Sequence, residues 1–526
     1  MVNEDRDRFE SELSRHDHEI DKLRMTLAAL EKGRDDLLQT RAKTLAAASS
    51  VGRLPAELLG EIFSWCAHLP ERSEAELART HRRQEKIVTV LTLPILNIAQ
   101  TCRRWRQISL SRPKFWTDIV IRFDTMYELS SLPLSEEIQS LLDLLMQYLG
   151  YSKSLPLTID IHAFGPLTSK RRLDRINSHP FLITMCCILS VLSSEMFRWR
   201  KVIAALDRDL LERYSDLLPA FGTENTNQNM PLLESFSIIF DEFNDSIIGE
   251  DWQPSLSVQL HSAVPQLRQL FIPHAPVDSG ISYFPWSQLT SLTINSLQDD
   301  SCEFLEHCSK LESFRILHYS CGDSFPSGHP FLLPRLTNLE ICMSIDAGSS
   351  EPDIDNRLDL FVILTLPSLS SLIITADSLD PDSVSVPIWN HDAFVDMMEH
   401  GFRQKLKRLS ISDIVISREE LQDVLSMTPS LTHFSHSFPL PEERHPVPHL
   451  IGYITNVLLH LTHLELFLPC KFDDKILTSI CSMLESSKLE CFKLRVLPDT
   501  EFDGLECMSR FDCLAKLPGC DYSIFC

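Results

Sequence analysis

One short pattern, L-x-x-L/F-x-I/L, recurs ten times between residues 233 and 494 and limits what this chain can fold into. The last two apolar positions are two residues apart, so in a β-strand they lie on one face, and the residue between them lies on the other. Successive motifs begin 22 residues apart at the closest, from Leu267 to Leu289, and 37 at the widest, from Leu369 to Leu406. The ten motifs begin at Leu233, Leu267, Leu289, Leu311, Leu336, Leu369, Leu406, Leu431, Leu461 and Leu489.

This period and signature are typical of leucine-rich repeats, in which each repeat supplies one strand and one helical connection. We therefore predict an α/β repeat fold: an N-terminal helix, a small α-helical module, and an irregular leucine-rich-repeat solenoid over residues 117–526. A chain of 526 residues suits such a stack, because each repeat packs only against its neighbours. The spacing is uneven and no Asn or Cys recurs after the last apolar position, so we expect an irregular arc. Duplication of an unrelated α/β domain is the alternative.

Further elements follow from the apolar spacing. The eighth motif carries His436 at its third position, where the others have Ile or Leu. Ser417 and Glu420 predict a capping box at the start of a linking helix. Expected strands at 116–123, 155–161 and 199–203 precede the repeats, with helices at 136–150 and 181–194 between them, a later helix after Asp473 or Asp474, and long polar excursions at 343–357 and 436–448.

A helical module precedes the repeats. Its first predicted helix follows Pro55, which suits a helix start because its missing N–H costs nothing there. Residues 67–91 then form a polar insertion that holds the chain's main basic stretch. A second segment, 93–108, has the spacing of one amphipathic helix, which Pro113 ends.

These segments resemble the F-box, a small helical family. The resemblance rests on L-P-x-E-L-L-x-x-I-F from Leu54, C-R-R-W-R-x-I from Cys102, and P-x-F-W from Pro113. It covers residues 53–116 and departs at the 67–91 insertion. In the family this module docks on the Skp-type adaptor of a cullin-RING ubiquitin ligase. A helix before the module and irregular repeats after it also resemble the F-box proteins of mushroom-forming fungi.

The resemblance implies a set of adaptor-binding residues. A free module of this size exposes apolar side chains that can act as anchors in a partner's groove. Core packing is the alternative for each of them; we favour it for Phe63 and Trp105, and favour the interface for Leu54, Pro55 and Leu58. The implied adaptor-binding residues are Leu54, Pro55, Leu58, Leu59, Ile62, Leu96 and Trp105.

Residues 4–48 predict a helix with a heptad seam. Apolar residues alternate at steps of four and three, which forms a stripe that pairs with another helix. His16 and Arg34 interrupt the seam, and Gly33 weakens the helix. The segment is therefore either a short coiled coil, with possible self-association of the chain, or a long helix folded back on its own domain.

Charge and cysteine use limit the partners and the compartment. The chain has 49 Lys and Arg against 73 Asp and Glu, a net charge of −24, which argues against binding nucleic acid or an anionic membrane surface. It has no apolar run long enough to span a membrane, and its charged N-terminus is unlike a signal peptide. Fifteen cysteines, mostly within apolar runs, indicate free thiols in an intracellular, cytoplasmic and/or nuclear protein.

No catalytic signature is present. The chain has no G-x-S-x-G, H-E-x-x-H, P-loop or Rossmann glycine pattern, so we expect no enzyme activity, no cofactor and no metal. We interpret His433, His436, His445 and His449 as polar residues of a surface loop.

We predict an F-box-type substrate-receptor subunit of an SCF-like ligase. It would bind a Skp-type adaptor, and through it a cullin, and hold an unknown protein substrate. A non-catalytic leucine-rich-repeat scaffold outside any ligase is the alternative. The residues predicted on the concave strand face, each interpreted as solvated surface, are Gln269, Phe271, Ser291, Thr293, Arg315, Asn338, Glu340, Arg408, Ser410, His463 and Glu465.

Overall fold

The computed structural model forms two compact units: Met1–Leu69 with Pro94–Phe115, and Pro70–Leu93 with Trp116–Cys526. None of the described helices is both long and apolar enough to cross a bilayer. The structure describes residues 2–48, 51–67, 91–92, 94–122, 134–163, 187–206, 230–240, 264–274, 284–297, 302–319, 330–344, 359–377, 387–399, 401, 405–437, 447–468, 478–480, 482–484, 489–496 and 521–525.

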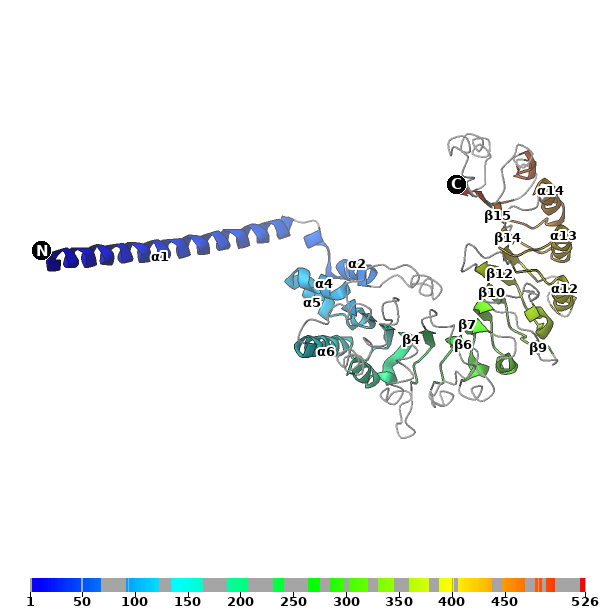
Figure 1. Ribbon diagram of the computed structural model, residues 1–526, viewed down its shortest axis with the longest axis horizontal. Helices are drawn as coiled ribbons and strands as arrows, with labels where there is room; N and C mark the ends of the chain where they lie inside the picture. The colour runs from blue at the N-terminus through cyan, green and yellow to red at the C-terminus, as the bar shows by residue number, and fades with distance from the viewer. Residues whose placement is uncertain are drawn as a thin grey trace. The chain divides into compact units, whose positions relative to one another are not determined.

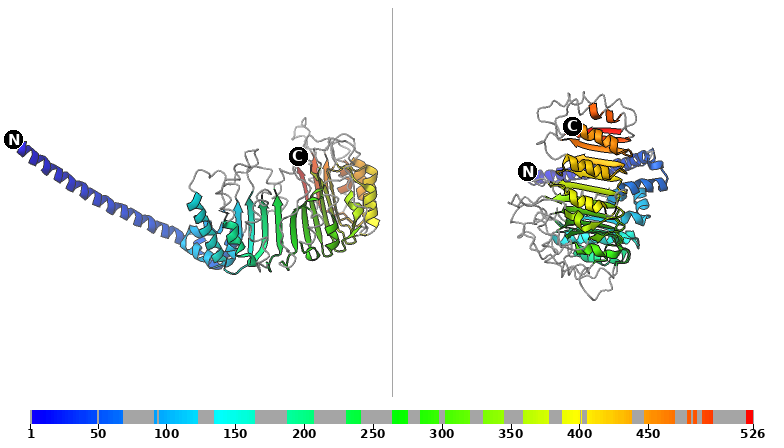
Figure 2. Two further views of the ribbon diagram at one scale, coloured as in Figure 1. Left: turned by 60° about the horizontal axis from the view of Figure 1, so that its bottom comes forward. Right: turned by 90° about the vertical axis from the view of Figure 1, so that its right-hand side faces the viewer.

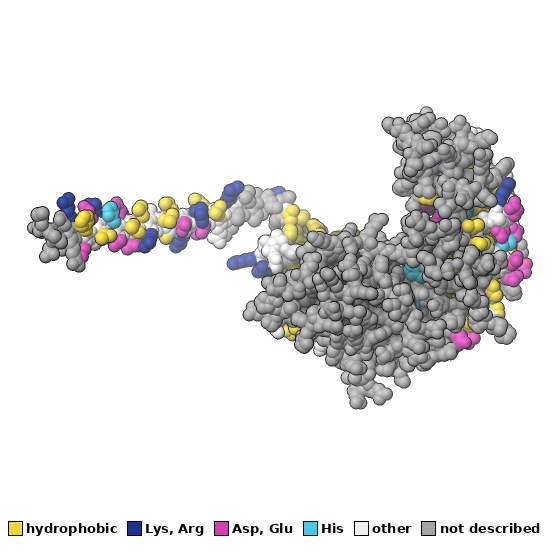
Figure 3. All heavy atoms as spheres, viewed as in Figure 1, with side chains coloured by type: hydrophobic (Ala, Val, Ile, Leu, Met, Phe, Trp, Pro, Cys, Tyr) yellow, Lys and Arg dark blue, Asp and Glu magenta, His cyan; other side chains and the backbone are white. Residues whose placement is uncertain are grey.

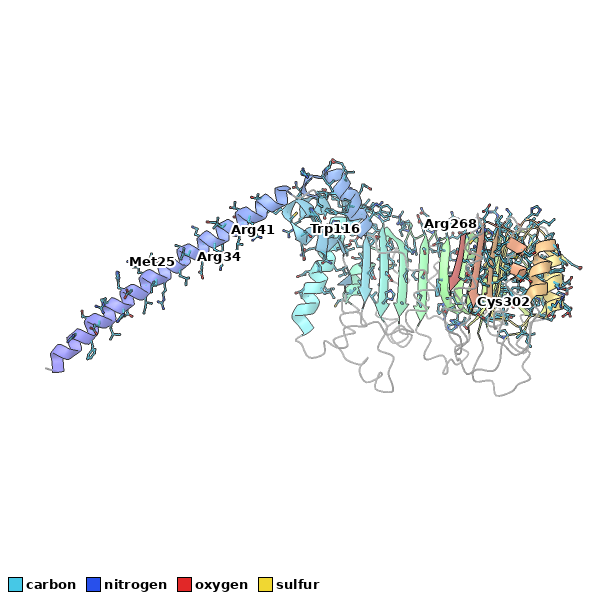
Figure 4. The ribbon with its side chains drawn as sticks, turned by 90° about the horizontal axis from the view of Figure 1, so that it is seen from above. Met25, Arg34, Arg41, Trp116, Arg268 and Cys302 are labelled. Atoms are coloured by element: carbon cyan, nitrogen blue, oxygen red, sulfur yellow. The ribbon has the colours of Figure 1, made fainter. Side chains whose placement is uncertain are left out.

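The first unit begins with α1, Val2–Ala48, a helix of 47 residues. Every side chain described between residues 8 and 41 is exposed. Hydrophobic side chains recur along its length among charged ones (Figure 3), and Met25, Arg34 and Arg41 project from it (Figure 4). The helix predicted at 4–48 is confirmed; its pairing with a second copy stays a prediction. The exposed members of the heptad seam are Phe9, Leu13, Ile20, Leu23, Leu27, Leu30 and Leu37.

Short helices follow α1 in the same unit. They are η1 (Val51–Arg53), α2 (Ala56–Ala67), α4 (Pro94–Thr101), α5 (Arg103–Leu110) and η2 (Pro113–Trp116).

The prediction of one helix over 93–108 is wrong, because the segment forms two helices, α4 and α5. Cys102 is extended, with φ −158° and ψ 168°, and ends α4. Its sulfur accepts a hydrogen bond from the backbone N–H of Trp105, 3.5 Å away, and so caps α5. Helical periodicity continues across the break, which is why the spacing alone suggests a single helix.

The second unit is built on one sheet, which has fifteen strands among the described residues. Its strands lie side by side in chain order (Figure 2), and all pair in parallel except β1, which is antiparallel to β2. The strands of this sheet are β1 (Leu91–Thr92), β2 (Asp118–Arg122), β3 (Leu157–Ala163), β4 (Trp199–Leu206), β5 (Ser235–Phe240), β6 (Gln269–His274), β7 (Ser291–Leu297), β8 (Ser313–Tyr319), β10 (Asn338–Ser344), β12 (Ser371–Asp377), β13 (Arg408–Ser412), β14 (His433–Ser437), β15 (His463–Leu468), β16 (Cys491–Val496) and β17 (Asp521–Phe525). The short strands β9 (Phe331–Leu332) and β11 (Leu364–Thr365) pair separately.

Each of the ten sequence motifs forms one strand, and its three apolar positions are buried. In the third repeat, for example, Leu289, Leu292 and Ile294 are each 0% exposed. Because neighbouring strands are in register, as Leu292 opposite Phe314, equivalent side chains stack in continuous rows. These rows are the core of the second unit. His436 fills the third position of its repeat and is also buried; it donates from Nδ1 to the carbonyl of Ile411, 3.1 Å away.

A hydroxyl ladder, which the sequence did not predict, runs along one edge of the repeats. The residue after the first leucine is Thr or Ser in several repeats, and its hydroxyl donates to a backbone carbonyl of the preceding repeat. Ser370 donates to Thr337, and Thr462 to Thr432, each over 3.0 Å. Each of these carbonyls also accepts backbone N–H groups of the following repeat, so the hydroxyls add a further hydrogen bond between neighbouring repeats.

The opposite face of the sheet is also buried over β4 to β8. Ile203, Ile239, Phe271 and Leu317 form an apolar cluster there with Ala205. The prediction that Phe271 and Thr293 are solvated is therefore wrong: they are 1% and 7% exposed. The motif determines which residues of a strand point to each face of the sheet. Whether the face opposite the motif's apolar positions is buried depends on the side chains of the neighbouring strands.

Helices connect the later strands: α12 (His391–Glu399), α13 (Arg418–Met427) and α14 (Val447–Val457), which lie on one side of the strands (Figure 1). The predicted capping box is confirmed, because Ser417 Oγ accepts from the N–H of Glu420 and the Glu420 carboxylate accepts from the N–H of Ser417. Helix α6 (Leu134–Ser152) precedes β3, and η4 (Met196–Arg198), η8 (Trp286–Gln288), η10 (Glu303–His307) and η11 (Asp359–Ile363) join other strands. Most of the 67–91 insertion, His445, Asp473, Asp474 and most of both polar excursions lie outside the described residues.

Candidate adaptor-docking surface

Helix α2 presents one buried and one exposed apolar face. Pro55 precedes its first residue, and the N–H of Leu59 donates to the carbonyl of Pro55 over 3.1 Å, which closes the first turn. Leu59 and Phe63, four residues apart, are 1% and 2% exposed. Helix α2 has twelve residues and carries apolar residues on both of its sides, but only the side with Leu59 and Phe63 is buried.

The exposed face carries an apolar stripe. Leu58 is 51% exposed, Ile62 45% and Trp65 85%. Pro55, also exposed, continues the series at steps of three, four and three residues, so all four lie on one side of the helix. We call Pro55, Leu58, Ile62 and Trp65 the α2 stripe.

Aromatic packing holds α2 against the following helices. The ring centroids of Phe63 and Trp105 lie 4.9 Å apart, and the ring planes are tilted by 58°. Aromatic pairs favour such tilted contacts over face-to-face stacking. Ile95, Ala99 and Ile108 are buried in the same unit. Trp105 is thus half-buried and contacts the core through Phe63, as the core interpretation predicted.

Arginines of α5 and the turn after it bond to the start of α2. The Arg104 guanidinium donates to the carbonyl of Leu54. Arg112 donates to the carbonyl of Glu57 over 3.4 Å and lies 3.5 Å from the Glu61 carboxylate. Gly60 leaves room for this, because a Cβ there would lie 2.0 Å from Cζ of Arg112. The α2 stripe is therefore held on a braced helix, which lowers the entropy lost on binding.

The predicted adaptor-binding residues separate into three groups. Pro55, Leu58 and Ile62 are exposed, Leu54 and Leu96 are half-buried with Trp105, and Leu59 lies in the core. Leu59 thus supports α2 from beneath instead of lining its surface. Trp65, which was not predicted, extends the stripe; its position three residues after Ile62 was the available signal.

The chemistry of this surface is that of a docking site. Trp and branched apolar side chains that are exposed together are typical of binding hot spots. Among the described residues no group of three or more His, Cys, Asp or Glu side chains could hold a metal ion.

A comparison with family models finds one described as F-box-like, which matches residues 51–122. A comparison with curated proteins finds no match. F-box domains generally bind Skp-type adaptors, and such a domain suggests a substrate-receptor role in a ubiquitin ligase. Residues 51–122, which contain the α2 stripe, are an F-box-like domain.

Proposed function

We propose that this chain is the substrate-receptor subunit of an SCF-like cullin-RING ubiquitin ligase. One observation carries the proposal: the F-box-like domain presents the α2 stripe to solvent on a helix whose other face is buried. Trp65, 85% exposed beside two branched residues, buries little of its surface against the described residues and fits an apolar groove on an adaptor.

Binding at the stripe draws on area that is still in contact with water. Leu58 and Ile62 each leave about half of their surface exposed. Full burial of such a side chain contributes about 1.5–3 kcal/mol, so the remaining half contributes about 1 kcal/mol each. Trp65 has the largest area to bury, and we propose it as the main anchor.

The second unit serves to hold the target. We propose that its strands and connections form an irregular leucine-rich-repeat solenoid, and that a protein target binds on it. The ligase then acts by proximity, because a bound target is held at high effective concentration near the ubiquitin-charged enzyme. In this proposal the chain itself is no enzyme and needs no cofactor.

Reconstitution tests the proposal. The full chain is mixed with a Skp-type adaptor, a cullin and its RING partner, and the assembly is isolated by size-exclusion chromatography. We expect one complex that contains all four, and loss of the complex for Leu58→Asp. A Leu58→Asp chain that still assembles would contradict docking through the α2 stripe, and a wild-type chain that does not assemble would favour the scaffold alternative.

We further propose that α1 pairs with α1 of a second copy as a parallel coiled coil. In that register Glu19 and Arg24 of opposite chains lie at flanking positions, where opposite charges attract. Leu23, Leu27 and Leu30, each more than half exposed, would be covered by the partner helix.

A further inference from the structure

The open face of the sheet carries a hollow of about 320 Å³ over β12 to β16. Strand register arranges its lining in two rows. Arg408, His433, His463 and Cys491 are directly opposite one another in the first row. The second row runs parallel to it, one side-chain step further along the strands. Its members are Ser410, Ser435, Glu465 and Lys493.

Residue size shapes the hollow. Ser410 and Ser435 are small and half-buried, so they form a low floor with two hydroxyl groups. Arg408 and His433 rise beside them in the first row. Ile373 of β12 closes one end. Hydrogen-bond donors of arginine, histidine and serine side chains therefore lie together in the lining of the hollow.

The two histidines are stacked and fixed in orientation. The rings of His433 and His463 lie 4.1 Å apart at 13°. The hydroxyl of Thr432 lies 3.1 Å from the carbonyl oxygen of Lys407 and 2.9 Å from Nδ1 of His433, and these contacts orient the His433 ring.

The neighbouring strand repeats the arrangement. The hydroxyl of Thr462 lies 3.0 Å from the carbonyl oxygen of Thr432 and 2.8 Å from Nδ1 of His463. Each ring is therefore held at Nδ1 by the threonine that precedes it in the chain.

The surroundings of His433 disfavour its charged form. Burial lowers its pKa from 6.5, and His463 and Arg408 lower it further, while Glu490 acts in the opposite sense. The other titratable groups that face the hollow, all on the two strands beyond, are Glu465, Cys491 and Lys493. An anion beside Arg408 acts in the same sense as Glu490, because a negative charge nearby favours the charged form of His433.

The charge of the hollow contrasts with the rest of the chain. The protein has a net charge of −24. The lining of the hollow, in contrast, has two basic side chains, Arg408 and Lys493, and one acidic side chain, Glu465. Glu465 and Lys493 are opposite each other on adjacent strands. The cation without an acidic counterpart in its row is Arg408, beside the serine floor.

We propose that this hollow is where the receptor grips its target, by seating an aspartate or glutamate of an extended acidic segment on Ser410 and Ser435 between Arg408 and His433. The proposal rests on the proposed function for its biological role. The hollow lies on an open sheet face, and Arg408 and Lys493 are both exposed, which suits a protein segment crossing the strands. Binding strengthens as the pH falls, because proton uptake by His433 adds positive charge next to the carboxylate.

The test measures fluorescence anisotropy of a labelled peptide, Gly-Asp-Glu-Gly-Asp-Glu-Gly, with the full chain. We expect binding at pH 6.0 to be at least fivefold tighter than at pH 7.5, since the peptide carboxylates stay ionised over this range. The matched peptide with Asn and Gln should bind at least tenfold more weakly. Free glutamate at equal carboxylate concentration should not compete; competition would mean a small-molecule site and overturn the assignment to a protein segment.

Variants locate the site. Arg408→Gln should weaken binding at least tenfold, whereas Arg335→Gln, which removes the same charge from an exposed residue outside the hollow, should stay within twofold. His433→Gln with His463→Gln should abolish the dependence on pH. Equal affinity for Arg408→Gln and wild type, or for the acidic and amide peptides, would overturn the proposal.

The two proposals fail separately. A chain that assembles with the adaptor but does not bind the acidic peptide keeps its proposed function and loses this site. A chain that binds the peptide through Arg408 but captures no adaptor keeps the site and loses the ligase role.

Discussion

Two adjacent leucines in α2 give opposite predictions. Leu59 is 1% exposed and Leu58 is 51% exposed, in the same helix and the same turn. Leu59→Ala removes a fully buried side chain and leaves a cavity, so we expect a loss of about 3–5 kcal/mol in the free energy of opening of the module. Leu58→Ala removes a side chain that buries about half of its surface and leaves no enclosed cavity, so we expect a loss of about 1 kcal/mol.

Hydrogen exchange with peptide-level resolution measures both values. The peptides to follow are those from 51–67 and 94–115, because these residues belong to the first unit and the repeat strands belong to the second. Peptides from β12 to β15 serve as the internal control and should not change. Equal losses for the two variants would refute the assignment of Leu59 to the core and of Leu58 to the surface.

Three further predictions concern other parts of the chain. Burial raises the pKa of the Cys308 thiol to about 12, so maleimide at pH 8 should label the exposed Cys66 and leave Cys308 unmodified in mass spectrometry. Since the pKa of Cys308 in the folded state lies above the ordinary 9.0, its contribution to the free energy of unfolding is fully present below pH 9 and is lost as the pH rises toward 12. A free energy of unfolding from urea titrations that does not change over this pH range would contradict the burial of Cys308. Ser370→Ala should cost about 1 kcal/mol in urea unfolding, because it removes one rung of the hydroxyl ladder; an unchanged midpoint would mean that the ladder does not contribute to stability. Leu23→Asp should convert a dimer into a monomer by light scattering, and a wild-type monomer at 50 µM would rule out the coiled coil (about 50 µM is a concentration at which even micromolar pairs form).

The repeat strands could be predicted because their signal is local. Leu289, Leu292 and Ile294 must all be buried for one strand to pack, so the motif and the strand coincide. The capping box at Ser417 is equally local, since its two hydrogen bonds join residues three apart. Such features need no knowledge of the rest of the chain.

Other features depend on neighbours that a sequence pattern does not show. The break at Cys102 arises from the backbone angles of one residue within continuing helical spacing. Phe271 is buried because strands on either side also present apolar residues on that face. Leu58 and Leu59 have the same side chain, and only the packing of α2 against α4 and α5 decides which one is exposed.

The hollow over β12 to β16 was missed for a related reason. His433 and His463 are thirty residues apart, and the sequence placed His433 in a surface loop. Parallel pairing in register brings the two rings together. His433 and His463 each lie two residues after the first leucine of their motifs, and this shared position was the available signal for the stack.

Adaptor affinity tests the central claim most directly. A purified Skp-type adaptor is immobilised, and its Kd for the full chain is measured by biolayer interferometry. For Ile62→Asp we expect a loss of at least about 30-fold, the effect of a hot spot worth about 2 kcal/mol. Leu459→Asp, which places the same charge on a 71% exposed leucine of the second unit, should bind within twofold of wild type. If Ile62→Asp binds as tightly as wild type, the α2 stripe is not the docking surface.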